Sequence, residues 1–304
     1  MPQTLRGLDP DRLERSCSPR RNSIRFGASA PGLERAEVYL TTCAFELHRH
    51  DTYAIGITTA GVQRFWYRGT RRTCLPGELH VLHPDEIHDG GAGTEHGFGY
   101  RILYIAPALI RDALDGAALP FVADPIHKPT PTTRRVLCLF ADIGEPLGGL
   151  AQVEIAATIA DVLHALGGRS DGRPGTIDAR AVELARDYLA AHAREQTPAS
   201  TLEQVTGADR FTLTRHFRRA FGTTPDRYRT LRRLALARAA IEGGLPLAHA
   251  AVDAGFADQS HMTRQFKRTY GVTPGRWMEL TAASPEESSH PEAVGCQNSV
   301  PPAN

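Results

Sequence analysis

Long apolar runs are missing from this sequence of 304 residues, in which no stretch approaches 18 consecutive apolar side chains. A membrane-spanning helix needs about 20 such residues, so the sequence predicts none. The first 21 residues include Asp9, Arg12 and Glu14 and lack the apolar segment of a secretory signal. We therefore expect a cytoplasmic protein without a membrane partner.

Cysteine is scarce and scattered. The five residues are far apart and show no CxxC spacing: Cys17, Cys43, Cys74, Cys138 and Cys296. This pattern argues against both a disulfide framework and a thiolate zinc site. A reducing compartment is the simplest expectation.

Net charge is also low, because 35 basic and 34 acidic residues leave +1. The balance is uneven along the chain. Residues 198–280 carry 13 Lys and Arg against 7 Asp and Glu, a net charge of +6, whereas residues 1–170 carry −1. Concentrated positive charge is typical of a domain that meets a polyanion such as nucleic acid.

The length favours two domains, and the sequence pattern changes accordingly. Short apolar runs separated by Gly and Pro predict strands over 36–105, and apolar residues at three- and four-residue spacing predict helices from about 107 to 166. The stretch GGRSDGRPG (167–175) predicts a flexible linker that leaves the two domains independent. Residues 176–280 have a helical pattern, and the polar, Pro- and Ser-rich residues 281–304 predict a disordered tail.

The helical half contains an internal repeat. TRHFRR (214–219) returns 49 residues later as TRQFKR (263–268), and GTTP (222–225) returns at the same offset as GVTP (271–274). Each unit predicts a short helix (about 199–205 or 247–254), a turn at Gly207 or Gly255, and a second helix (about 210–220 or 259–269). This order is that of the helix-turn-helix motif, in which the second helix enters the DNA major groove.

Helical spacing divides each second helix into two faces. Leu213, Phe217 and Ala220 form an inward stripe in the first unit, and Met262 and Phe266 do so in the second. The opposite faces carry side chains suited to DNA: Phe211, Thr214, Arg215 and Arg218 in the first unit, and Ser260, Thr263, Arg264 and Lys267 in the second. One such face alone would more simply be a solvated surface, but two copies with local charge favour DNA. The arginines of the intervening helix, 225–242, fit phosphate contacts or plain solubility equally well.

Residues 198–280 resemble the tandem helix-turn-helix domain of the AraC (arabinose-operon regulator) family, most specifically in TRHFRRAFGTTPDRY (214–228) and GFADQSHMTRQFKRTYGVTP (255–274). The resemblance implies base-reading positions at Arg210, Phe211, Thr214, Arg215, Gln259, Ser260, His261 and Arg264. Arg218, Thr263 and Lys267 are then candidates for phosphate contacts. The implied partners are double-stranded DNA, a small-molecule effector, a second copy of the chain and RNA polymerase.

The N-terminal half more weakly resembles the cupin-like effector domain of such regulators, in FELHRHDTYAIGITTAGVQRFWYRG (45–69) and LPGELHVLHPDEIHDGG (75–91). His48, His50 and His88 are similar to part of a cupin metal-ligand set, but no Glu follows His50 within four residues. We therefore expect an effector pocket without metal or cofactor. Tyr53 and Trp66 are further candidates for its lining, with core packing as the alternative, and His80, His83 and His96 are expected at the surface.

Together these features predict an α+β protein with five segments: an arm (1–35), a cupin-like β-barrel with a helical dimerisation segment (36–167), a linker (168–175), an all-α domain with two helix-turn-helix motifs (176–280) and a tail (281–304). The expected function is a sequence-specific transcriptional regulator, an effector-responsive activator rather than an enzyme. The alternative is a metal-dependent cupin enzyme fused to a DNA-binding module.

Overall fold

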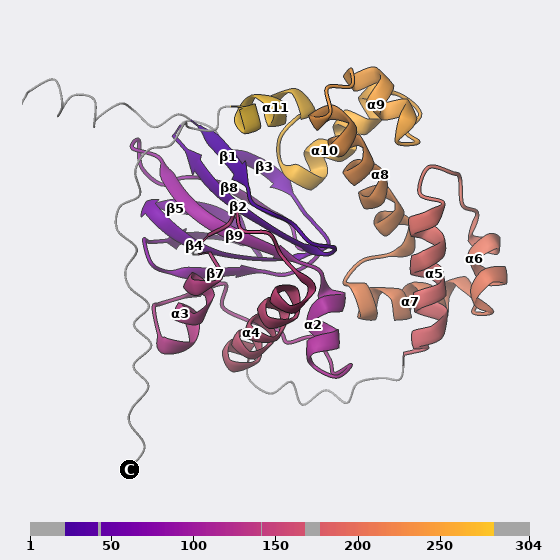
Figure 1. Ribbon diagram of the computed structural model, residues 1–304, viewed down its shortest axis with the longest axis horizontal. Helices are drawn as coiled ribbons and strands as arrows, with labels where there is room; N and C mark the ends of the chain where they lie inside the picture. The colour runs from indigo at the N-terminus through magenta and orange to yellow at the C-terminus, as the bar shows by residue number, and fades with distance from the viewer. Residues whose placement is uncertain (1–21, 42–43, 141, 168–176, 283–304) are drawn as a thin grey trace, which may run out of the picture.

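The computed structural model describes residues 22–41, 44–140, 142–167 and 177–282 (Figure 1). The predicted linker lies outside the described residues, as do most of the predicted arm and all but two residues of the predicted tail.

The N-terminal half is built from antiparallel strands that form two sheets. The larger sheet has the order β1-β2-β9-β4-β7-β10 and the smaller one the order β3-β8-β5-β6. The strands are β1 Ser23–Phe26, β2 Leu33–Leu40, β3 Phe45–His48, β4 Tyr53–Gly61, β5 Gln63–Tyr67, β6 Thr70–Cys74, β7 Leu79–Leu82, β8 His88–Ala92, β9 Phe98–Ile105 and β10 Ile126–His127. The predicted α+β class is confirmed, and among the described residues the strands pair within two sheets rather than around a closed barrel.

Strand β4 lies near the centre of the larger sheet and is buried on both sides. Tyr53, Ile55 and Ile57 pack in the core cluster beneath the helices of this half, whereas Ala54 belongs to the cluster on the opposite face. The strand domain also begins earlier than the predicted residue 36, because β1 starts at Ser23 and pairs with β2. Four residues of sequence SIRF are too short to show a strand pattern by themselves.

Ten helices complete the described part of the chain. They are α2 Pro107–Ala113, α3 Pro131–Cys138, α4 Gly149–Gly167, α5 Ala179–Ala191, α6 Ala199–Thr206, α7 Arg210–Phe221, α8 Pro225–Glu242, α9 Leu247–Asp253, α10 Gln259–Tyr270 and α11 Pro274–Ala282. Helices α2, α3 and α4 cover one side of the larger sheet, and α5 to α11 form the second half of the molecule (Figure 1).

Helix α4 is the one described helix whose length and composition would allow it to cross a membrane. The sequence-based exclusion of any such helix was therefore too strict. Ile159, Val162 and Leu163 of α4 are buried against the sheet. A core helix of a folded domain passes the same test, so this helix is weak support for a membrane span.

The two helix-turn-helix units begin and end their second helices in the same way. Asp209 caps α7 by accepting from the backbone N–H of Phe211 and Thr212, and Asp258 caps α10 by accepting from that of His261. Both helices end at a left-handed glycine, Gly222 or Gly271, and each is followed by a Thr-Pro helix start. The repeat therefore encodes two copies of one local structure.

The two halves pack against each other, contrary to the expectation of domains joined only by a linker. The core of the second helix-turn-helix unit, including Phe266 and Trp277, belongs to one cluster with residues of both sheets. Glu34 of β2 accepts two bonds from the Arg238 guanidinium of α8, at 2.7 and 3.1 Å. The first unit instead has its own core with α5. Local sequence patterns carry no signal for such docking, because the paired residues lie far apart in the chain.

Candidate functional site

The inward and outward faces of α7 and α10 lie as the spacing predicts. Leu213, Phe217 and Ala220 are buried in α7, as are Met262 and Phe266 in α10. Phe211 is 77% exposed, which is unusual for a large aromatic side chain on a helix. The outward face of α7 therefore remains open to a partner.

Most of the predicted DNA-reading residues are accessible, but several are already engaged. Gln259, Ser260, Arg215, Arg218 and Arg264 are exposed, whereas Thr214 and Thr263 are half-buried. Arg210 is tied to Glu203 of α6, with Nε 2.8 Å from the carboxylate oxygen. The His261 ring packs edge-on against Phe256, with their centroids 5.5 Å apart.

Lys267 faces the strand domain. Its Nζ lies 2.7 Å from the carboxylate of Glu46 in β3. This strand and the residue after it are hydrogen-bonded to the end of α10, because Glu46 N–H donates to Gly271 O at 2.9 Å and Arg49 N–H to Arg268 O at 3.0 Å. Contact of Lys267 with a phosphate requires this ion pair to open.

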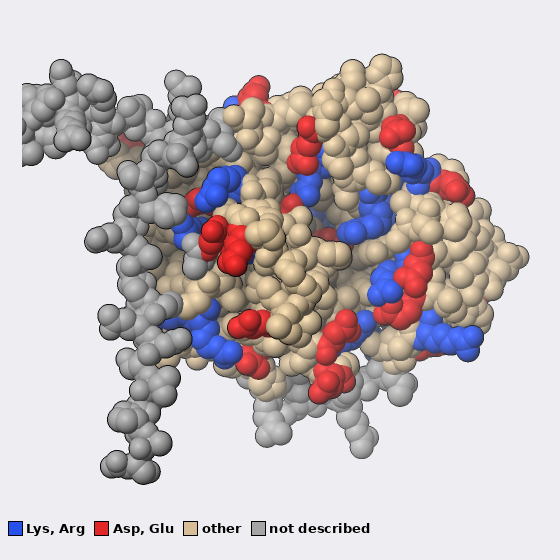
Figure 2. All heavy atoms as spheres, in the orientation of Figure 1, with Lys and Arg blue, Asp and Glu red and all other residues tan. Residues whose placement is uncertain are grey.

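Two arginines of α8, Arg227 and Arg233, follow neither of the two predicted uses. Arg233 is buried and donates to the carbonyls of Ala193, Arg194 and Glu195, and Arg227 donates to Arg49 O and to the Thr269 hydroxyl. These hydrogen bonds stabilise the packing of α8 against other segments of the chain. Figure 2 accordingly shows basic and acidic side chains interspersed on this face of the helical half rather than one basic surface.

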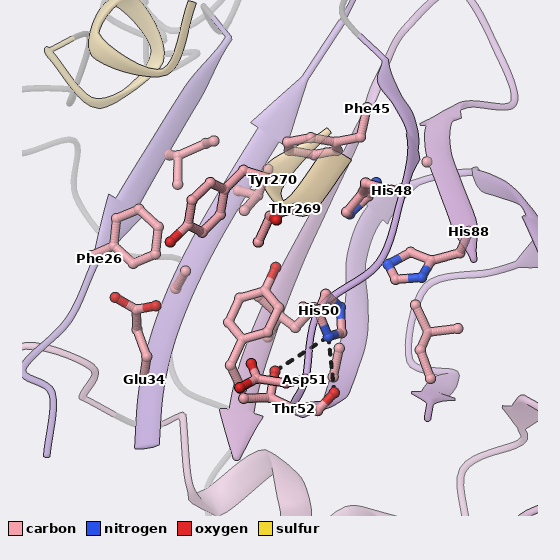
Figure 3. Close-up of a pocket in the computed structure, with 18 of the residues that line it drawn as sticks. Phe26, Glu34, Phe45, His48, His50, Asp51, Thr52, His88, Thr269 and Tyr270 are labelled. Atoms are coloured by element: carbon pink, nitrogen blue, oxygen red, sulfur yellow. Dashed lines mark hydrogen bonds between the residues drawn. The ribbon is translucent and has the colours of Figure 1, made fainter. Parts of the chain in front are cut away.

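A cavity of about 290 Å³ lies between the two sheets and the helical half (Figure 3). Its size is near the lower limit of small-molecule pockets, and much of its wall is apolar, including Ile24, Val38, Leu82 and Ile102. The predicted residues His48, His50 and His88 line it. It therefore satisfies the geometric requirement for an effector site.

Tyr53 and Trp66 do not line this cavity, which corrects their predicted placement. The Tyr53 side chain lies on the helix-covered face of β4, where its hydroxyl donates to Pro120 O at 3.2 Å. Trp66 alternates with the buried Phe65 and Tyr67 and so points away from the core. Successive side chains of a strand point to opposite faces of the sheet. A prediction that is out of phase by one residue therefore moves a side chain from the cavity wall to the other face.

His80 and His83 are buried rather than at the surface, which corrects a second expectation. His80 lines the cavity against Gly56, where a Cβ atom would lie only 2.4 Å from the imidazole ring. Burial lowers the pKa of His80 to about 3, and the nearby His88 adds to this effect. The His80 ring is thus a neutral polar group of the wall at neutral pH.

The other three cavity histidines form one cluster. His48 and His88 are paired across β3 and β8, with ring centroids 4.3 Å apart, and His50 lies 4.8 Å from His88. Burial, followed by the neighbouring His88, lowers the pKa of His50 to about 3. The pKa of His48 is lowered for the same reasons. Burial lowers the pKa of His88 as well, so the environment favours the neutral form of all three rings.

The helical half supplies cavity residues that the sequence analysis missed. They are Leu231, Arg232, Ala235, Arg238, Thr269, Tyr270 and Trp277. Tyr270 and Phe26 lie across the cavity from the histidines in Figure 3. One signal was available: the arginines of α8 occur on every side of the helix, which is atypical of a helix with one solvated face.

Comparisons with known families and proteins agree with this architecture. Residues 30–182 match the AraC-like ligand binding domain, and residues 202–279 match a helix-turn-helix domain family. An uncharacterized HTH-type transcriptional regulator of Bacillus subtilis, YbfI, is 27% identical over 229 residues, which are 71% of this chain and 81% of the relative.

The fold is similar to that of ToxT from Vibrio cholerae. One ToxT structure superposes with a TM-score of 0.60 at 11% identity, covering 82% of this chain and 99% of that chain. A second, with an unsaturated fatty acid bound, gives a TM-score of 0.58 at 13% identity, covering 88% of this chain and 97% of that chain. At this level of identity the likeness extends to the fold alone.

Proposed function

This chain belongs to the AraC family of transcriptional regulators, and from that premise we propose that α7 and α10 read two successive major grooves of one operator. It is a DNA-binding regulator with a ligand-binding domain, and the family is not one of enzymes. The alternative of a cupin enzyme fused to a DNA-binding module is therefore set aside. We propose that the chain is divided into the five segments predicted from its sequence, except that the effector domain also includes β1.

The repeated surface of α7 and α10 is the observation that carries this proposal. Each helix has an Asp cap, a buried aromatic stripe and an outward face with an arginine in its second turn, Arg215 or Arg264. Arginine recognises guanine through two hydrogen bonds in the major groove. Two such helices held on α8 are suited to sites about 34 Å apart, one turn of the duplex.

In vitro selection from a random duplex pool tests the proposal with the full-length protein. We expect the selected sequences to contain two conserved elements with centres about 10 base pairs apart. Major-groove methylation interference should map to both elements. A single conserved element would contradict the two-groove arrangement.

The cavity supports a proposal for the effector class. Within the part of the chain that the structure describes, Arg232 Nε is buried without a hydrogen-bond partner, and an Arg232 Nη atom is 4.0 Å from Asp51. A ligand carboxylate satisfies such a guanidinium, while the apolar wall accommodates a hydrocarbon body. The ToxT ligands named in two solved structures are also monocarboxylic acids with large apolar parts. We propose a small amphiphilic carboxylic acid.

Arg232→Gln is expected to weaken binding of such acids by about 10–100-fold, because a hydrogen bond to a charged group contributes about 1.5–3 kcal/mol. Isothermal titration with aliphatic and aryl monocarboxylic acids measures this, with the corresponding alcohols as control ligands. Arg219→Gln, at an exposed position of α7 outside the cavity, is the control variant. Equal affinity for acids and alcohols would contradict the assignment.

A second copy of the chain is the proposed partner at α4. Leu150 and Val153 are 85% and 65% exposed and lie one turn apart, away from the buried face of this helix. Exposed leucine and valine at this spacing are suited to a helix–helix contact between two subunits.

Changing Leu150 and Val153 together to glutamate should convert a dimer to a monomer, since two charges would be buried in the contact. Sedimentation equilibrium at micromolar concentration measures the change. Val252→Glu, at a 66% exposed position of α9, is the matched control and should remain dimeric. A wild-type monomer, or a dimer in both variants, would exclude α4 as the interface.

The remaining parts of the proposal depend on the family relation. Activation would involve contact with RNA polymerase at the promoter, and a regulator of bacterial operons acts in the cytoplasm, where the DNA is located.

A further inference from the structure

The histidine cluster brings three imidazole rings to one point of the cavity wall. One ring nitrogen from each of His48, His50 and His88 lies within 4.8 Å of the other two. His48 lies in β3, His50 follows it by two positions, and His88 lies in the adjacent strand β8. Three nitrogens bound to one Zn²⁺ would lie closer together than this, because Zn–N bonds are about 2.0–2.1 Å, so binding requires small rotations of the side chains.

Backbone contacts fix the tautomer of each ring. Nδ1 of His48 lies 2.7 Å from Glu46 O, Nδ1 of His50 is 2.9 Å from Thr52 O, and Nδ1 of His88 is 2.9 Å from Glu86 O. A carbonyl can only accept, so Nδ1 carries the proton in all three neutral rings. Each Nε2 therefore presents a lone pair. Protein histidines that ligate metals are commonly oriented by the same kind of outer hydrogen bond.

Packing alone leaves part of this arrangement unexplained. His50 Nε2 is buried and has no hydrogen-bond partner among the described residues. A buried acceptor without a partner destabilises a fold, and native structures rarely retain one without another role. Together with the neighbouring ring nitrogens of His48 and His88, this unpaired acceptor forms a candidate ligand set.

The geometry points to a divalent transition-metal site formed by Nε2 of His48, His50 and His88, with its remaining coordination positions open to the cavity. Three neutral imidazoles suit Zn²⁺, and also Fe²⁺, Ni²⁺ or Cu²⁺. The metal has a binding role here and supplies a coordination point for an oxygen donor on the effector. This site goes beyond the proposed function, which requires only the cavity.

The site also adjoins the second helix-turn-helix unit. A Cβ atom at Gly271, the residue that ends α10, would lie 2.8 Å from His48 Nδ1. Glu46 of β3 and Arg49, just after it, are hydrogen-bonded to this same end of α10. A metal ion that fixes His48 therefore also fixes β3 against α10, and we expect it to alter the affinity of the protein for DNA.

The first experiment measures metal binding alone. Full-length protein without an affinity tag is stripped with chelator and titrated with Zn²⁺ against a chromophoric competitor. We expect one ion per chain, with affinity reduced by about 100-fold or more in His50→Gln and in His88→Gln, since loss of even an outer-shell partner costs 10–100-fold. Co²⁺ should show ligand-field bands in the wild type that both variants lose.

The matched control is His80→Gln, which changes a buried imidazole of the same cavity that lies outside the three-ring cluster. It should bind Zn²⁺ as the wild type does. Thermal unfolding in chelator verifies that each variant is folded. Zn²⁺ binding weaker than about 10 μM in the wild type, or equal binding by all three variants, would overturn the metal site.

The second experiment measures DNA affinity of the metal-free and Zn²⁺-loaded protein on a duplex selected by the wild type. A change of several-fold, absent in His50→Gln, is expected. Unchanged affinity would overturn the coupling to α10. Because the Zn²⁺ titration uses neither DNA nor an organic effector, failure of the metal site is distinguishable from failure of the proposed function.

Discussion

Replacing Phe266 by alanine is expected to lower the free energy of unfolding by about 3–5 kcal/mol. The Phe266 ring is completely buried and packs against Tyr270 and Trp277, with centroids 4.5 and 5.8 Å away. Deleting it leaves a cavity in a core that joins α10 to both sheets. Urea unfolding followed by tryptophan fluorescence measures the loss, since Trp277 is in direct contact.

Phe211→Ala is the matched control, because it removes the same ring from the outward face of α7. Stability should change by no more than about 0.5 kcal/mol at this exposed position. Its effect should instead be on DNA affinity. If Phe266→Ala unfolds like the parent but no longer binds DNA, the inward and outward faces of α10 are exchanged.

Arg264→Ala is expected to weaken binding to the selected operator by about 1–3 kcal/mol, or roughly 10–100-fold. The Arg264 side chain is exposed in the second turn of α10, where a guanidinium can reach the edge of a guanine. Loss of a base contact removes discrimination, so the affinity for random duplex should fall much less. Competition titrations with both duplexes measure the two effects.

The control Arg276→Ala removes the same charge from α11, outside the recognition helices. Its surface pair with Glu279 contributes little to stability. This variant should bind the operator and random duplex with affinities that are reduced to the same small extent. Equal losses on both duplexes for Arg264→Ala would instead place its guanidinium on the phosphate backbone.

Much of the helical half could be predicted from the sequence because its signals are local. The duplicated TRxFxR and Gly-x-Thr-Pro segments fix where α7 and α10 begin and end, and the inward stripe follows from helical spacing alone. The predicted limits 210–220 and 259–269 each differ from the structure by one residue.

The cavity could be predicted only in part. His48, His50 and His88 stand out because of their spacing, but Tyr53 could not be placed, since β4 is buried on both faces and its apolar pattern gives no strand phase. Arg232 and Tyr270 enter the cavity only because two halves of the chain dock. Docking depends on pairs such as Glu34 and Arg238, which are 204 positions apart and leave no local pattern.

The shared core of the second helix-turn-helix unit and the sheets limits how this regulator can be recombined with its relatives. A chimera joined at the linker would place foreign side chains opposite Phe26, whose ring lies 5.1 Å from Trp277, and opposite Glu34. The first unit has a core of its own with α5, but it also contacts α2, where Arg111 lies 3.5 Å from Glu183 and over the Phe221 ring. Grafting the DNA-binding region therefore requires the matching surfaces of α2, β1, β2 and β3.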